Sequence, residues 1–213
     1  MSTLDLEEQE QLAELKAWWK RHGNTLTSVL TAALLALAAW NGWSWYQRNQ
    51  SQQAAALYET VQKALAANDL KALRDAAGSV LERFPGSSYE PLAAMVSAKA
   101  HIQGGDSKTG RAQLQWVADN AKTEDLRSIA RLRLAAILAD ESAGDEALKL
   151  LDAKPAPAYE GLYAAARGDI FLAQKKQDEA RGAYRAALDK ADAKDQAFKQ
   201  SVQQRLDALG EGS

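Results

Sequence analysis

The 213-residue sequence contains no cysteine, only two histidines and only four prolines. Without cysteine the chain can form no disulfide, no thiolate metal site and no thiol nucleophile. The two histidines, His22 and His101, lie on opposite sides of a long apolar segment, so we expect that they share no site. There is no glycine-rich phosphate loop and no G-x-S-x-G motif. The sequence therefore predicts a protein that is not an enzyme and that needs no metal or cofactor.

Charge is absent from residues 26–46, which read LTSVLTAALLALAAWNGWSWY. As an α-helix these 21 residues would span about 31 Å, close to the hydrocarbon thickness of a bilayer. The few polar residues are small, and most of them lie toward the two ends. We expect a transmembrane helix over residues 26–46, with the lipid bilayer as its surroundings.

Aromatic residues flank this segment. Five of the six tryptophans lie at its edges, as expected for rings at the two membrane interfaces. The expected interface residues are Trp18, Trp19, Trp40, Trp43, Trp45 and Tyr46. The less favoured interpretation is that they are ordinary core aromatics.

A cleaved signal peptide is the main alternative to an anchor. Ala36-Leu37-Ala38 imitates a cleavage site, but it lies in the middle of the apolar run. The run is longer than the usual 7–15 residues of a signal sequence, and the segment before it is long and contains five acidic residues. The sequence favours an uncleaved anchor.

Basic residues near the ends of the span predict its orientation. Lys16, Lys20 and Arg21 precede the span, whereas only Arg48 follows it closely. The positive-inside rule then places the N-terminus in the cytoplasm. We expect a cytoplasmic stub over residues 1–25 and, in a bacterial inner membrane, a periplasmic domain over residues 47–213.

Alanine dominates the chain after the span, with 37 in the 163 residues from Ser51 onward. The four prolines lie where helices should break, so the fold class is all-α. The periodicity predicts helices over 51–67, 70–84, 88–103, 107–121, 125–141, 145–153, 158–175, 178–191 and 195–209.

An internal repeat appears within these helices. The segments LADESAGDEALKLL and LAQKKQDEARGAY share an Asp-Glu-Ala triplet at a spacing of 33 residues, and Ala112 lies 35 residues before Ala147. Such periods, with two helices each, are typical of tetratricopeptide repeats. We expect a tetratricopeptide-repeat-like α-solenoid of about three to four helix hairpins plus a C-terminal helix. Ala112 and Trp116 are the expected matches in the earlier unit, and a plain alanine-rich bundle is the alternative.

The first helix of each hairpin should line the concave face of such a solenoid. The residues expected there are mostly apolar: Leu92, Met95, Ile102, Ile129, Leu132, Leu162, Asp169 and Leu172. This groove could hold a segment of another protein, or the chain's own last helix could cover it. From Ser51 onward the chain has 22 basic and 23 acidic residues, and this balance predicts no nucleic-acid partner.

The order of features resembles one family. Three segments are similar to the YfgM-like ancillary subunit of the SecYEG translocon. They are the stub LAELKAWWKRHGNTL, the segment NGWSWYQRNQSQQAAALYETV and the repeat SIARLRLAAILADESAGDEALKLLD. This resemblance implies an inner-membrane protein that associates with the Sec channel and with a membrane-anchored periplasmic chaperone, and that assists nascent secretory chains. It also suggests an alternative, in which the stub regulates an envelope-stress response. The family has no active-site residues to carry over.

Overall fold

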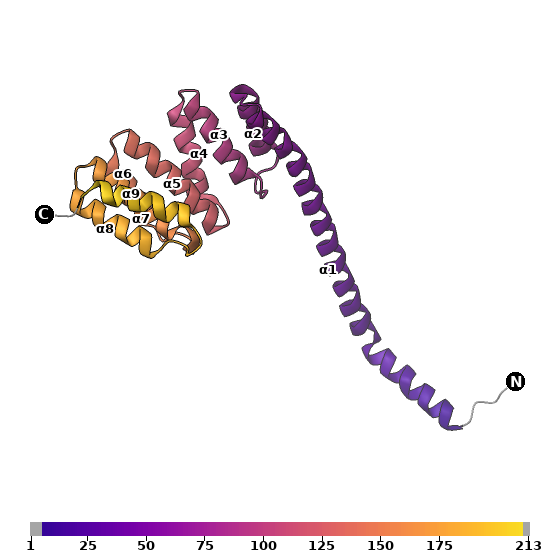
Figure 1. Ribbon diagram of the computed structural model, residues 1–213. Helices are drawn as coiled ribbons and strands as arrows, with labels where there is room; N and C mark the ends of the chain where they lie inside the picture. The colour runs from indigo at the N-terminus through magenta and orange to yellow at the C-terminus, as the bar shows by residue number, and fades with distance from the viewer. Residues whose placement is uncertain (1–5, 211–213) are drawn as a thin grey trace. The chain divides into compact units, whose positions relative to one another are not determined.

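The computed structural model describes residues 6–210, and the regular elements of this part of the chain are all helices (Figure 1). They are α1 (Leu6–Ala66), α2 (Leu70–Arg83), α3 (Glu90–Gln103), α4 (Ser107–Asn120), α5 (Glu124–Asp140), α6 (Gly144–Leu151), the short 3-10 helix η1 (Pro157–Tyr159), α7 (Glu160–Ala173), α8 (Gln177–Asp189) and α9 (Gln196–Ala208). The all-α fold class is confirmed, and from α2 onward each helix lies within a few residues of its expected range.

The chain divides into two units, Met1–Gln52 and Gln53–Ser213. The helix expected over 51–67 does not start afresh after the span, because α1 continues without interruption to Ala66. Residues 47–66 contain neither glycine nor proline and are rich in glutamine and alanine, so nothing in this stretch stops a helix.

In the first unit, α1 exposes large apolar side chains around its whole circumference. Leu30, Leu34 and Leu37 are each 58% exposed, and Leu35 is 65% exposed. Thr27, a polar residue at the edge of the apolar run, donates its hydroxyl to the carbonyl oxygen of Gly23 at 2.8 Å. Among the described residues, α1 is the one helix long and apolar enough to cross a membrane.

The second unit repeats one turn four times. Asn68, Gly105, Ser142 and Lys175 all have positive φ, and each lies two residues before the second helix of a hairpin begins. After each of them, a backbone N–H bonds the carbonyl five residues earlier at 2.8–3.1 Å. This is the Schellman arrangement of a helix C-terminus. The spacings of 37, 37 and 33 residues therefore define four hairpins: the end of α1 with α2, then α3–α4, α5–α6 and α7–α8.

The turn fixes the repeat register and corrects one expectation. The fourth residue of each second helix is buried where the hairpin crosses, and these residues are Leu73, Gly110, Ala147 and Ala180. Ala112, which was expected to match Ala147, is instead exposed, and Trp116 is 38% exposed. Gly110 takes the crossing position because a Cβ there would lie 2.5 Å from Ile102 Cγ1 and 2.8 Å from the Ala98 carbonyl oxygen.

Three apolar clusters run through the stacked hairpins. The first joins the end of α1 to α2 and α3 through residues such as Val61 and Val80. The second is the largest and extends from α3 to α7. The third joins α7 and α8 to Val202 of α9, which is 1% exposed. A solenoid of four hairpins closed by a C-terminal helix is thus confirmed.

Ion pairs brace the start of α5. Glu124 accepts hydrogen bonds from Arg127 and Arg131 at 2.6–2.8 Å. Burial opposes the ionisation of Glu124, but the two guanidinium groups outweigh it and lower the pKa of the carboxyl. Arg127 and Arg131 also donate hydrogen bonds to the carbonyl oxygens of Ala121 and Ala118, at 2.9 and 3.3 Å, and so tie the start of α5 to the end of α4.

Candidate functional site

A surface pocket of about 410 Å³ lies between α3 and α5, with α4 beneath it. Its apolar lining consists of Met95, Ile102, Leu114, Ala136 and Ile137. The polar lining residues are Lys99, Gln103 and Arg133. This volume falls in the range of sites that accept a ligand or a few side chains of a partner. We call this site the α3–α5 pocket.

The helix register explains why these residues meet. Met95, Lys99 and Ile102 follow one another at intervals of four and three along α3, so they share one face of that helix. On α5, Ala136 and Ile137 lie three and four residues after Arg133, so both are its neighbours on the helix surface. Each of these two sets of residues lies on the first helix of its hairpin.

The eight groove residues expected from the sequence fall into three groups. Met95 and Ile102 line the α3–α5 pocket. Leu92, Ile129 and Leu132 are half-buried against the central apolar cluster. The three residues on α7, namely Leu162, Asp169 and Leu172, are exposed.

Asp169 has partners within the chain. It accepts a hydrogen bond from the hydroxyl of Tyr184 at 2.8 Å and is held by Arg205 of α9 at 2.7 and 2.9 Å. Burial, and next this bond to Asp169, raise the pKa of Tyr184. Helix α9 thus packs on α7 and α8, while the α3–α5 pocket is lined by α3, α4 and α5.

Sequence reasoning missed six lining residues of this pocket: Lys99, Gln103, Leu114, Arg133, Ala136 and Ile137. Lys99 could have been found, because it lies between Met95 and Ile102 on one helix face. The residues on α5 could not, since their place depends on how α5 packs beside α3.

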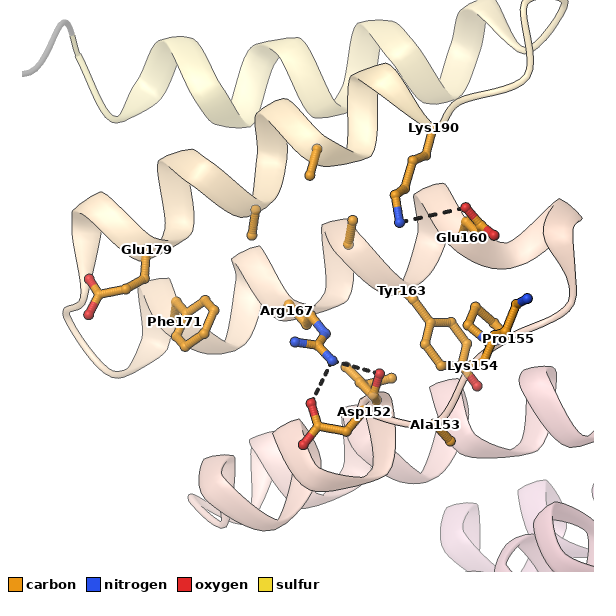
Figure 2. A pocket seen from close by; sticks show the side chains of 14 residues that line it. Asp152, Ala153, Lys154, Pro155, Glu160, Tyr163, Arg167, Phe171, Glu179 and Lys190 are labelled. Carbon is orange, nitrogen blue, oxygen red and sulfur yellow. Dashed lines mark hydrogen bonds and ion pairs between the residues drawn. The ribbon is translucent and has the colours of Figure 1, made fainter.

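A second pocket, of about 580 Å³, lies between the end of α6 and the α7–α8 hairpin. Helix α6 has only 8 residues, whereas α4 has 14 and α8 has 13, so the chain leaves this helix early. Figure 2 shows two ion pairs here: Arg167 with Asp152 at 2.7 Å, and Lys190 with Glu160 at 3.6 Å. Four of its charged side chains are therefore already paired within the chain.

Residues expected at the membrane lie on α1. Trp18, Trp19 and Tyr46 are about half exposed, and Trp40, Trp43 and Trp45 are more exposed still. Lys16, Lys20 and Arg21 are also exposed on this helix. Residues 1–5 of the expected stub lie outside the described residues.

The described residues contain no cluster of three or more His, Asp or Glu side chains that could hold a metal ion. His101 bonds Asp106 through its Nδ1 at 3.1 Å. Asp106 also accepts a bond from the backbone N–H of Thr109 and so caps α4. The Asp106 pKa is lowered mainly by its hydrogen bonds to Thr109, then by His101. These groups stabilise a helix end.

The fold and the pocket define a helical-repeat protein with an apolar surface site and one helix that could span a membrane. The model of the tetratricopeptide repeat-like domain family matches residues 16–211. The chain belongs to this family. Four curated relatives share one name, ancillary SecYEG translocon subunit, and they confirm the resemblance to the YfgM-like family.

Two of these relatives illustrate the extent of the similarity. The protein from Neisseria gonorrhoeae is 29% identical, over 96% of this chain and 98% of its own. The protein from Escherichia coli is 24% identical, over 85% of this chain and 87% of its own. Among solved structures, the first TPR of Spaghetti (RPAP3) bound to an HSP90 peptide is 16% identical and covers 76% of this chain and 96% of its own, at a TM-score of 0.33.

Proposed function

We propose that this protein is a single-span inner-membrane scaffold that associates with the Sec translocon and binds other proteins through its repeat domain. In this proposal residues 1–25 are cytoplasmic, 26–46 span the membrane and 47–213 are periplasmic. The support is the shared name of relatives that align over nearly their whole length, together with an apolar helix whose exposed side chains suit lipid rather than water.

The α3–α5 pocket is the observation that carries the binding role. Ile102 and Ile137 are only half-buried, and both line the pocket formed by α3, α4 and α5. A partner segment that inserts an apolar side chain there would remove this surface from water, at about 25 cal/mol for each Å² buried. A helical solenoid with such a pocket is a typical peptide-binding surface.

The proposed partners are the translocon, a membrane-anchored periplasmic chaperone and nascent secretory chains. Anchoring the repeat domain in the same membrane as its partners makes the second contact effectively intramolecular. Weak contacts at the pocket would then suffice, because the local concentration of the partner is high. This arrangement suits a protein that assists newly translocated chains and releases them again.

Co-purification tests the proposal. The full-length protein is isolated from membranes in mild detergent, and the translocon subunits recovered with it are quantified by mass spectrometry. We expect clear enrichment over an unrelated single-span protein, a reduced recovery of partners with Ile137→Glu, and no reduction with the control Trp116→Glu. Failure of the wild-type protein to enrich any translocon subunit would contradict the proposal.

Topology is tested separately with an alkaline phosphatase fusion at the C-terminus, because this enzyme is active only in the periplasm. We expect an active fusion that stays in the membrane after carbonate extraction. An active cytosolic reporter at the same position, or release by carbonate, would overturn the topology.

A second candidate function is regulation of an envelope-stress response through the stub. It is motivated by apolar side chains on α1 before the span, where Leu15 is 60% exposed and Leu12 is 42% exposed. Deletion of residues 2–14 separates the two functions. If the stub regulates, the stress response should change while the translocon still co-purifies.

A further inference from the structure

We propose that the α3–α5 pocket selects protein segments in which a bulky apolar side chain is flanked by carboxylates. This inference rests on the proposed function, since it names the chemistry of the segment that the scaffold binds. It depends on two features of the pocket: its apolar floor, and two cationic side chains that form no ion pair among the described residues.

The apolar floor sets the first requirement. Met95 and Leu114 are almost fully buried, at 6% and 1% exposure, so they form a fixed base. Ile102 and Ile137 are half-buried and form the sides. A volume of about 410 Å³ has room for one or two large side chains of a partner, such as leucine or phenylalanine.

The charges set the second requirement. Lys99 from α3 and Arg133 from α5 are both exposed, and neither takes part in an ion pair among the described residues. Two other basic side chains on α4 and α5 are already paired. Arg111 pairs with Glu141 at 2.6 Å, and Arg131 pairs with Glu124 at 2.7 Å.

Among the residues that the structure describes, no acidic side chain lines the α3–α5 pocket. Asp140 lies two turns along α5 from Arg133 and is not part of the lining. Two like charges beside one apolar site repel each other, and a carboxylate on the partner would relieve that repulsion. A partner with its own lysine or arginine at this place would be rejected.

The pocket beside α6 provides the contrast. Its Arg167 and Lys190 are already paired with Asp152 and Glu160, as Figure 2 shows. A carboxylate arriving there would have to displace an existing partner of the cation. Charge complementarity therefore assigns acidic segments to the α3–α5 pocket.

Peptide binding by the full-length protein in lipid nanodiscs tests this inference. The probe is a fluorescein-labelled peptide, GSDLFEGS, measured by fluorescence anisotropy. Two matched peptides isolate its features: GSNLFQGS replaces both carboxylates with amides, and GSDAAEGS removes both apolar anchors. The variant Lys99→Gln with Arg133→Gln removes both cations, and Lys149→Gln with Arg185→Gln makes the same charge change at exposed positions outside the pocket.

We expect wild-type protein to bind GSDLFEGS about three- to tenfold more tightly than GSNLFQGS, since two exposed ion pairs each add a modest increment. GSDAAEGS should bind more weakly than either. The preference for the acidic peptide should disappear in the Lys99/Arg133 variant, persist in the control variant and shrink as salt is raised.

Equal binding of the acidic and amide peptides by wild-type protein would overturn the inference, and so would a preference that survives the loss of both cations. No measurable binding of any peptide would overturn it as well. These outcomes differ from a failure of the proposed function, in which translocon subunits would not co-purify at all. If they co-purify equally well with the Lys99/Arg133 variant, only the inference about carboxylates fails.

Discussion

Gly110→Ala is expected to destabilise the protein, although alanine is the better helix former. Alanine gains about 1 kcal/mol over glycine inside a helix. At Gly110 the added Cβ would meet the Ala98 carbonyl oxygen at 2.8 Å and the Ile102 side chain at 2.5 Å. A backbone oxygen cannot move without shifting α3, and overpacking of this kind costs about 1–3 kcal/mol. We expect a net loss of up to about 2 kcal/mol.

Gly182→Ala is the matched control. Gly182 also lies inside a helix, α8, but apart from its two chain neighbours and the backbone of its own helix no described atom lies within 4 Å of the position that its Cβ would occupy. This variant should therefore gain stability, by about 0.5–1 kcal/mol. For a protein of this size, 1 kcal/mol shifts the melting temperature by about 2–4 °C.

Thermal unfolding of the two full-length variants in mild detergent, followed by far-UV circular dichroism, measures both effects. The melting temperature should fall for Gly110→Ala and rise for Gly182→Ala. If the melting temperature of Gly110→Ala rose as much as that of Gly182→Ala, α3 and α4 would not cross closely at Gly110. The register that aligns Gly110 with Ala147 and Ala180 would then be wrong.

Three further predictions concern titration and packing. Glu124→Gln should lose about 0.5–1 kcal/mol of stability near neutral pH, because burial is outweighed by Arg127 and Arg131, which keep the folded pKa of the carboxyl below its ordinary 4.5. The urea midpoints of variant and wild type should converge as the pH falls through that lowered pKa. Burial and Asp169 raise the folded pKa of Tyr184, so the wild-type protein should lose stability as the pH rises above the ordinary tyrosine pKa of 10.0. Tyr184→Phe should abolish this loss. Melting temperatures that fall equally with pH for both proteins would contradict the prediction. Val202→Ala should cost about 2 kcal/mol by loosening α9, and an unchanged urea midpoint would show that α9 is not docked.

The positions of the helices could be predicted from the sequence because capping residues mark the points where several of them begin. Asp69, Asp106 and Asp195 each cap the helix that follows by accepting a backbone N–H, and aspartate before an apolar periodic run is a strong start signal. The uninterrupted length of α1 could not be predicted in the same way. The composition changes after Arg48, but a change of composition does not end a helix.

The repeat register was only partly predictable. Two of the four turn positions are Asn68 and Gly105, which readily adopt positive φ, but the other two are Ser142 and Lys175, which do not. The residue types at these four positions therefore do not reveal the common turn, which is seen only in the backbone dihedral angles. This is why Ala112 was aligned with Ala147 although Gly110 occupies the equivalent position.

The candidate site was predictable on one helix only. The spacing of Met95 and Ile102 on α3 indicates a shared face, but exposed charges such as Arg133 are common on helices and give no signal by themselves. Whether such a charge belongs to a binding site depends on which helix packs alongside, and this is fixed by the stacking of whole hairpins.

The role of the α3–α5 pocket is tested most directly by photo-crosslinking in living cells. A photoreactive amino acid is placed at Ile137 in the pocket and, for comparison, at Trp116, which is 38% exposed on α4 outside it. Crosslinks to a translocon subunit, to a membrane-anchored chaperone or to a secretory chain are expected from Ile137 and not from Trp116. The absence of crosslinks from Ile137, or the same products from both positions, would contradict a binding role for this pocket.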